Sequence, residues 1–361
     1  MRGRHGARWP LFWLAAAGFA GAQLPVVTHS ELQAVHADGT SSYTGPTGFV
    51  IRGILVTDAD EMFDTAYDPE ATNGGSVGAV YQMFIQGVEG DRGGTALYMA
   101  QNYEAIGPWV PVGNDYGPAW TPEVRRVLQD ADGRVFRKGD LVEVTARISL
   151  FYSGKRNINE NHRTATNNNF DVSLLKPNVG LPQAEVVAVS DLVREDGTQI
   201  FDATRAFGGE HWQGMRVRID GLRLISTNGW CPTNEWAARQ CRVEDADGRP
   251  FVLRLPRVDL GPPPVGFFTA VGILNQEGGQ TNGYELFVQE IGPMLDLRAG
   301  ASGGMELSFP LDYEGYVLEA CDELSASPEW KQLDATPVLR VVVEDEDGRP
   351  TRSYRLKRKI D

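Results

Sequence analysis

The sequence is poor in the residues from which catalytic and metal sites are usually built. It has five histidines and three cysteines among 361 residues. No histidine lies in an H-x-H, H-E-x-x-H or H-x-x-E-H pattern, and no cysteine pair has zinc-binding spacing. A G-x-S-x-G elbow, a P-loop and a dinucleotide-binding fingerprint are also absent. We therefore expect neither catalysis nor a cofactor, although a two-carboxylate glycosidase site stays open in so acidic a chain.

Long apolar runs are missing too, apart from a short one at the N-terminus. Three arginines precede an apolar stretch from Leu11 to Ala20, and an A-x-A site ends at Ala22. This order is typical of a cleaved secretory signal, and the run is too short to anchor the chain in a bilayer. We predict a signal peptide over 1–22 and a protein secreted to the periplasm, cell surface or medium, without membrane insertion. An uncleaved amphipathic helix is the alternative.

Positive charge is scarce, with 34 Lys and Arg against 48 Asp and Glu and a formal net charge of −14. A field of this sign repels nucleic-acid phosphate at long range, and no basic stripe offsets it. The charge argues against tight, nonspecific binding of polyanions and leaves local basic patches open.

The three cysteines are Cys231, Cys241 and Cys321. Cys231 and Cys241 bracket a loop between two expected strands, so in an oxidising compartment we predict a disulfide between them. Two free thiols are the alternative. Cys321 is predicted to be a small buried residue of a strand.

The same order of local signals occurs twice, about 160 residues apart. Each copy runs from a helix start through an Asp-Gly-Thr turn to an alternating strand. These signals lie at Ser30, Asp38 and 49–56 in the first copy and at Ser190, Asp196 and 215–225 in the second. The repetition predicts one structural unit used twice, and each copy is long enough to bury its own core.

Short apolar runs separated by Gly and Pro predict an all-β protein. Thr121 and Pro122 start a predicted helix in the first copy. Five strands with a helix between the third and fourth are the arrangement of an OB-fold barrel. In the second copy three prolines at 262–264 replace the helix, which predicts a trimmed barrel. Strand signals lie at 49–56, 80–86, 95–99, 141–150 and 170–175 in the first copy, and at 215–225, 241–244, 251–255, 267–274 and 284–289 in the second.

A third region follows a short flexible joint from Gly300 to Gly304. Strand signals at 305–309, 316–320, 338–343 and 353–357 predict a small β-sandwich. The predicted fold is therefore all-β, with two tandem OB-like five-stranded barrels plus a small C-terminal β-sandwich. The predicted boundaries are 1–22 for the signal, 23–180 and 181–299 for the barrels, and 300–361 for the sandwich.

Acidic turns recur in all three regions, at 130–134, 245–249 and 345–349. Asp-Gly favours a positive φ at a hairpin tip, so we predict hairpin turns. A calcium loop is the alternative, but it needs a downstream acid that Arg and the next strand replace here. The acidic loop over 58–70 is likewise predicted to be solvated rather than to gather a cation.

Several motifs carry a family resemblance. Three motifs resemble the OB-fold modules of secreted bacterial proteins: M-F-I-Q-G at 83–87, G-T-A-L-Y-M at 94–99 and K-G-D-L-V-E-V-T-A-R-I-S-L-F-Y-S-G-K-R-N-I at 138–158. In those modules a strand ending in I-Q-D-like residues precedes a G-D-x-V-x-V-x-G strand. This chain departs from the pattern at Gly87, where an acid is common, and at Ala146, where glycine is common. V-R-I-D-G-L-R-L at 217–224 looks like the same module again. Because such modules are nucleic-acid-binding-like and often lie beside extracellular nucleases, the resemblance implies a binding role.

The C-terminal segment resembles the β-sandwich endings of large secreted proteins of environmental bacteria. Their formula, L-S-W-P … G-Y-x-L-E … W … Y-R-L, is similar to M-E-L-S-F-P at 305–310, G-Y-V-L-E at 315–319 and Y-R-L at 354–356. Phe309 replaces the usual Trp. No catalytic role attaches to that module, so the resemblance implies a structural or adhesive domain.

Two loops of the first copy hold the candidate ligand-binding residues. The polar segment from 152 to 169 is predicted to join the fourth and fifth strands beside the usual OB ligand face, or else to be a mobile polar loop. The aromatic loop before the predicted helix suits stacking on sugars or bases, or plugs the barrel end; Trp212, Trp230 and Trp236 raise the same alternatives in the second copy. The candidates are Tyr152, Lys155, Arg156, Asn157, Asn159, His162 and Arg163 in the first segment and Trp109, Tyr116 and Trp120 in the second.

These observations predict a secreted, non-catalytic binding protein with an oligomeric ligand along its first barrel. The family resemblance implies single-stranded nucleic acid, while the acidity and the aromatic loops permit a glycan. A structural or adhesive scaffold of the cell surface is the alternative. A hydrolase accessory protein, or a hydrolase with an unrecognised site, is the third hypothesis.

Overall fold

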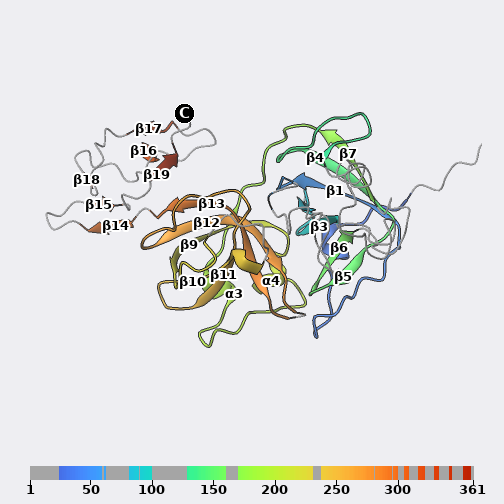
Figure 1. The fold of residues 1–361 in the computed structure, drawn as a ribbon, viewed down its shortest axis with the longest axis horizontal. Coiled ribbons are helices and arrows are strands. Elements are labelled where there is room, and N and C mark those ends of the chain that lie inside the picture. The colour runs from blue at the N-terminus through green and yellow to red at the C-terminus, as the bar shows by residue number, and fades with distance from the viewer. Residues whose placement is uncertain are drawn as a thin grey trace, which may run out of the picture.

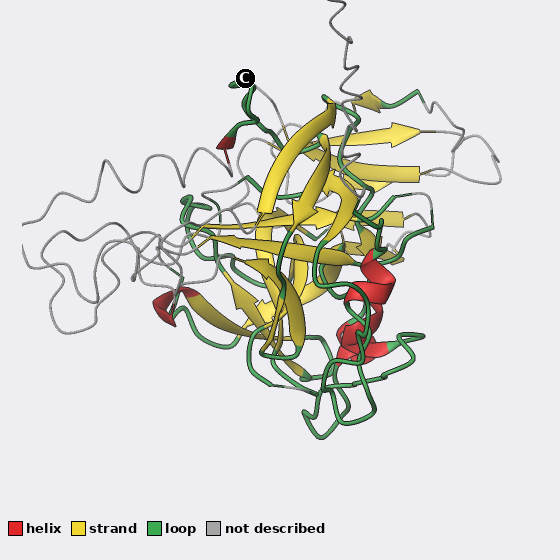
Figure 2. Ribbon diagram, turned by 90° about the vertical axis from the view of Figure 1, so that its right-hand side faces the viewer, coloured by secondary structure: helices red, strands yellow, loops and turns green. Residues whose placement is uncertain are grey.

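The structure is a computed structural model in which 43% of the residues lie in strands and 7% in helices. Figure 1 shows two barrels side by side, with the C-terminal strands at one end, and Figure 2 shows how few helices accompany the strands. The all-β, OB-like prediction is confirmed. The described residues are 24–58, 61, 81–88, 90–99, 128–159, 170–230, 237–279, 281–294, 296–299, 305–308, 316–321, 329–332, 341–343 and 353–358.

The first barrel is built on a sheet with the strand order β5-β6-β3-β2-β1-β4-β7. All neighbours pair antiparallel except β3 and β6, which run parallel with Leu97 opposite Ile158. Its strands are β1 (Phe49–Leu55), β2 (Tyr81–Gln86), β3 (Gly94–Met99), β4 (Leu141–Ala146), β5 (Leu150–Tyr152), β6 (Lys155–Asn159) and β7 (Phe170–Lys176).

One sequence interpretation for this barrel is wrong. Residues 155–159, expected in a loop, form β6, whereas the strand expected at 170–175 is present as β7 beside β4. Ser153 and Gly154, with φ of 52° and 89°, make the tight turn that reverses the chain between β5 and β6. Ile158 then points into the apolar core of the barrel. The helix predicted from Thr121 lies outside the described residues, apart from Leu128, which is helical.

The second barrel has the five strands that its sequence predicts. They close into a ring, because β9 pairs with both β10 and β12, β12 pairs with β13, β13 runs parallel to β11, and β11 pairs with β10. No helix lies between β11 and β12, as the prolines require. The strands are β9 (Arg216–Leu224), β10 (Gln240–Glu244), β11 (Pro250–Arg254), β12 (Phe268–Gln276) and β13 (Tyr284–Pro293); the short α4 (Gly208–His211) and the 3-10 helix η1 (Ala237–Arg239) precede β9 and β10.

The segments that enter the two barrels share one hydrogen-bond pattern. In α1 (His29–Leu32) and α3 (Val189–Leu192) an acidic side chain accepts from the backbone N–H that precedes the helix. Asp38 and Asp196 each accept from a threonine N–H and hydroxyl two residues later. Before each helix the chain runs parallel to the first strand, as the Val26–Val50 bridge in one copy and as β8 (Glu185–Val186) beside β9 in the other.

The C-terminal region contributes two three-stranded sheets, β14-β15-β18 and β17-β16-β19. The predicted boundary at residue 300 falls between β14 and β15, which pair antiparallel. Cys321, the last residue of β16, is buried as predicted. The strands are β14 (Asp296–Ala299), β15 (Met305–Ser308), β16 (Tyr316–Cys321), β17 (Lys331–Gln332), β18 (Val341–Val343) and β19 (Ser353–Arg358).

The acidic turns at 130–134 and 245–249 are tight turns. Gly133 and Gly248 have φ near +80°, and the first aspartate of each turn accepts hydrogen bonds from backbone N–H groups two and four residues later. The carboxylate is thus used by its own turn. The third turn, at 345–349, lies outside the described residues.

Candidate ligand-binding surfaces

The outer face of the first barrel's second and third strands is buried against the second barrel. Met83 and Ile85 point into the first core, whereas Phe84 between them belongs to a separate buried cluster that spans both barrels. The rings of Phe84 and Phe287 meet edge to face at 5.6 Å. The cluster, here called the seam core, consists of Val56, Phe84, Ala96, Ile273 and Phe287, none more than 2% exposed.

Backbone contacts tie the seam at its edge. The Gly94 N–H donates to the carbonyl of Gln213 at 3.0 Å. A Cβ on Gly94 would collide with the backbone carbonyl of Gly214, and a Cβ on Gly214 would lie 2.5 Å from the carbonyl of Gly94. Two backbone segments can pass this closely only where neither residue carries a side chain. The two glycines therefore determine how closely the barrels approach each other.

Polar side chains complete the seam. Arg92 forms a two-pronged ion pair with Glu185 at 2.7 and 3.0 Å and donates to the carbonyl of His211. The side chain of Gln289 donates to the carbonyl of Val56 at 2.6 Å. These groups come from strands, loops and the segment between the barrels, so the two barrels form one interlocked unit.

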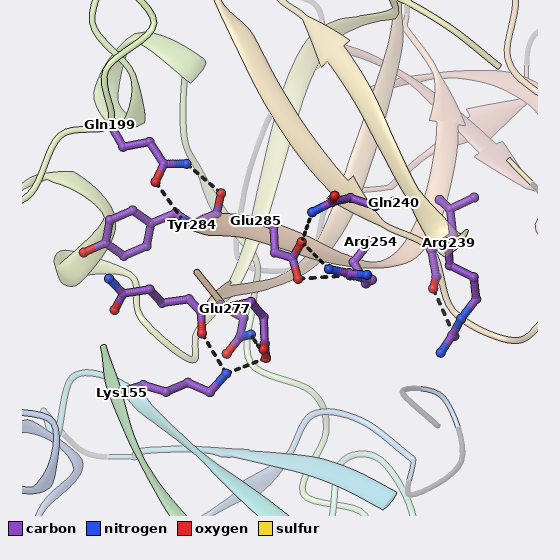
Figure 3. A network of polar contacts seen from close by, with 11 residues as sticks. Lys155, Gln199, Arg239, Gln240, Arg254, Glu277, Tyr284 and Glu285 are labelled. Atoms are coloured by element: carbon purple, nitrogen blue, oxygen red, sulfur yellow. Dashed lines mark hydrogen bonds and ion pairs between the residues drawn. The ribbon is translucent and has the colours of Figure 1, made fainter. Parts of the chain in front are cut away.

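Lys155 belongs to this seam and not to an exposed loop. Its ammonium donates to the carbonyl of Gln276 at 2.7 Å and to the carboxylate of Glu277 at 2.6 Å, and only 3% of its side chain is exposed. Figure 3 shows the lysine reaching from the first barrel to this pair on the second. The prediction that Lys155 contacts an anionic ligand is therefore corrected, because a carboxylate of the same chain already neutralises it.

We expect Lys155→Ala to lower the free energy of unfolding by about 2–4 kcal/mol, because the buried Gln276 carbonyl and Glu277 lose their common donor. Chemical denaturation of the purified protein measures this. Lys176→Ala, at an exposed position of β7, is the control and should stay within about 0.5 kcal/mol of wild type. Equal stability of the two variants would show that the seam does not depend on Lys155.

Arg156, another candidate, is held by its own barrel. Its guanidinium donates to Ser41 at 2.7 Å and to Ser149 at 3.2 Å, and it lies 5.0 Å from the ring centre of Tyr43. Its backbone N–H and carbonyl both bond to the side chain of Gln33. These contacts give Arg156 a structural role.

The other candidates of the first barrel are divided between buried, exposed and undescribed positions. Asn157 is buried, whereas Tyr152 is 62% exposed at the end of β5. Asn159 is the last residue of β6. His162, Arg163, Trp109, Tyr116 and Trp120 lie outside the described residues, so their predicted roles stay predictions.

The two tryptophans described in the second barrel are packed against it. Trp212 donates from its indole N–H to Glu185 at 3.0 Å, and Trp230 donates to the carbonyl of Gly261 at 2.9 Å. Both side chains cover the core of the second barrel. Their contacts favour the plug interpretation over stacking on a ligand; Trp236 lies outside the described residues.

A second polar network lies on the second barrel beside Lys155. Arg254 donates from Nε and Nη2 to the two carboxylate oxygens of Glu285 at 3.1 and 3.0 Å, and the Gln240 amide adds a third donor at 2.9 Å. Figure 3 shows these side chains converging from β10, β11 and β13. Both charged side chains are almost fully buried, and burial raises the pKa of Glu285 although Arg254 opposes it.

Two buried titratable groups have strongly shifted pKa values. His29 lies between the Thr95 hydroxyl, 2.8 Å from Nδ1, and the Arg52 carbonyl, 3.1 Å from Nε2, and burial lowers its pKa to about 4. Glu210 accepts a hydrogen bond from the Tyr284 hydroxyl at 2.7 Å, and burial raises its pKa to about 7. Arg205 acts electrostatically on both, and Asp91 acts on His29.

The two shifts predict opposing effects of pH on stability. Stabilisation from the raised pKa of Glu210 is complete below about pH 4.5 and is lost as the pH rises through 7. Stabilisation from the lowered pKa of His29 is complete above about pH 6.5 and is lost as the pH falls through 4. Each shift corresponds to on the order of 3 kcal/mol, so between these limits the two largely cancel.

Glu210→Gln should remove the glutamate's contribution, so that the effect of His29 on the pH dependence of stability can be measured. Relative to wild type, its free energy of unfolding should fall by on the order of 3 kcal/mol between pH 7 and pH 4.5, as measured by urea denaturation at each pH. His29→Gln is the matched control, and its difference from wild type should run the opposite way. Parallel pH profiles for wild type and Glu210→Gln would contradict the assignment.

Exposed arginines on the outer faces of β9 and β10 were missed as candidates. Arg242 is exposed, and its side chain makes no hydrogen bond or ion pair in the described part of the chain. Arg223 pairs with Glu244 across the strands and lies 5.7 Å from the ring centre of Phe267. The sequence signal for these arginines was the alternation of charged and apolar residues in R-V-R-I-D and Q-C-R-V-E, since every second side chain of a barrel strand faces outward.

The remaining predictions concern a disulfide, metal sites and membrane spans. Cys241 is buried in β10, while Cys231 lies outside the described residues, so the disulfide stays a prediction. Within the described ranges, no group of three or more His, Cys, Asp or Glu is placed to hold a metal ion. No helix in that part of the chain is long and apolar enough to cross a membrane.

Comparisons with known proteins add little to this geometry. No family model matches the chain, and no curated protein matches it. Among solved structures, a replication protein A heterotrimer bound to ssDNA is similar with a TM-score of 0.26 and 9% identity, over 70% of this chain. This chain spans about half of that one, since 49% of it is covered. A likeness this low carries no argument, so the fold assignment rests on the strand pairing described above.

Proposed function

We propose that the chain is an exported, non-catalytic binding protein that holds an oligomeric ligand, single-stranded nucleic acid or glycan, on its second barrel. One observation carries this proposal. The faces of β2 and β3, the strands with which OB folds bind oligomers, are closed by the second barrel, whereas the outer faces of β9 and β10 stay exposed. The first barrel then serves as a rigid support. Export rests on the N-terminal sequence 1–22.

The test is binding of the purified chain, from residue 23 onward, to an oligothymidine and to a set of polysaccharides over a range of salt concentrations. Phosphate contacts give an affinity that falls steeply with salt, whereas sugar contacts hardly respond. Binding of either polymer supports the proposal. Binding of neither would overturn it.

A structural or adhesive scaffold is the second candidate, and the seam favours it. The interlocked barrels already form one unit without a ligand, and several exposed charges of the first barrel are paired within the chain. Arg52 with Glu143 and Arg147 with Asp171 are examples. Absence of polymer binding, together with retention on the surface of expressing cells, is the outcome expected for a scaffold.

A further inference from the structure

We propose that the ligand of the second barrel is single-stranded nucleic acid, held by an exposed arginine face that crosses β9, β10, β11 and the residue just before β12. This inference rests on the proposed function and names the site and the ligand class. The arginine face is defined here as Arg223, Ile225, Arg242, Val252 and Phe267.

The strand register places these five residues side by side. Arg242 lies opposite Val252 of β11, and its carbonyl accepts from the N–H of Ile225 at 3.0 Å. Leu222 lies opposite Phe268, which puts the neighbouring Arg223 beside Phe267. The face therefore crosses four adjacent strands, about 15 Å at the usual inter-strand spacing. The side chains of this face lie on the outside of the barrel, because successive residues of a strand point to opposite faces and their chain neighbours are buried in the core. These neighbours include Leu222, Val243 and Phe268.

The charge of this face differs from that of the whole chain. Among the described residues Arg242 has no counter-charge, and Arg223 pairs with Glu244, so the face carries an excess of positive charge on a chain of formal charge −14. A planar guanidinium binds the paired oxygens of a phosphate with two parallel hydrogen bonds. An exposed arginine without a partner is therefore suited to a phosphate, which a neutral glycan lacks.

The same face is apolar where bases would lie. Phe267 is 38% exposed, and Ile225 is 49% exposed. Val258 and Val265, in the segment just before Phe267, are exposed as well. A single-stranded nucleic acid alternates charged phosphates with flat bases, and stacking on an aromatic ring is independent of sequence because every base has a π face. The alternation of arginine with Phe267 and aliphatic side chains fits that chemistry.

The experiment compares binding of an oligothymidine of about 15 nucleotides by wild type and variants of the whole chain. Arg223→Ala with Arg242→Ala should weaken binding and lower the slope of log affinity against log salt by about 1.4, since each lost phosphate contact accounts for about 0.7 on single strands. Phe267→Ala should weaken binding roughly 5–150-fold and leave the slope unchanged, because stacking involves no counterion.

Two arginines of the first barrel are matched controls. Arg52 pairs with Glu143 across neighbouring antiparallel strands, as Arg223 does with Glu244. Arg137 is exposed, and its side chain has no partner in the described ranges, as is true of Arg242. Arg52→Ala and Arg137→Ala should bind the oligothymidine as wild type does. Thermal melting of every variant shows whether it is folded, and Arg242→Glu provides a second test if the double variant is not.

The outcomes separate this inference from the broader proposal. Wild type that binds oligothymidine while the face variants bind equally well overturns the arginine face and leaves the proposed function standing. Binding of a neutral polysaccharide but not of oligothymidine overturns nucleic acid as the ligand class. Wild type that binds neither polymer overturns the proposed function and this inference together.

Discussion

Gly94→Ala is expected to destabilise the protein by about 3 kcal/mol or more and to uncouple the barrels. The added Cβ would meet the backbone carbonyl of Gly214, and neither backbone can shift without breaking the hydrogen bond from Gly94 to Gln213. Overpacking a rigid contact usually costs about 1–3 kcal/mol, and here the seam core would lose its packing as well. Differential scanning calorimetry measures the effect, and we expect the single transition of the two barrels to divide into two.

Gly48→Ala is the matched control for this substitution. Its Cβ would lie 3.4 Å from a flexible leucine side chain, which is ordinary contact, so we expect wild-type stability and an undivided transition. If Gly94→Ala also melted like wild type, the barrels would not approach each other as described here. The proposal that the second barrel closes the face of β2 and β3 would then fail.

Arg254→Met is expected to lower the free energy of unfolding by about 3–5 kcal/mol. The substitution leaves the carboxylate of Glu285 buried, with the Gln240 amide as its one remaining partner among the described residues, and an uncompensated buried charge is costly. Urea denaturation at pH 7 measures the loss. The deficit should shrink at lower pH, because burial already raises the pKa of Glu285 and loss of Arg254 raises it further, so the carboxyl becomes neutral on mild acidification.

The double variant Arg254→Met with Glu285→Leu separates charge from packing. Because it removes both charges, it should recover most of the stability lost by the single variant. A double variant as unstable as the single one would show that the shape of these side chains matters more than their charge pairing.

The sequence by itself determined the local structure of both barrels. Alternation of apolar residues placed all five strands of the second barrel within a few residues, and the three prolines at 262–264 excluded a helix before β12. The Asp-Gly turns also followed from their residues, since an aspartate side chain satisfies the turn's own N–H groups. Such features depend on neighbours in the chain, so a sequence pattern is enough to predict them.

Only the tertiary structure decided which faces are free. In the sequence Phe84 is an apolar residue of a strand, and Lys155 is a cation that follows a glycine turn. Neither local sequence pattern shows that the second barrel covers these side chains. Their partners, Phe287 and Glu277, lie more than 100 residues away. The error over β6 has the same origin, because a polar strand such as K-R-N-I-N is stabilised by pairing with β3 and not by its own periodicity. Burial of side chains on these faces depends on contacts between distant segments, which cover the face of β2 and β3 and leave the outer faces of β9 and β10 exposed.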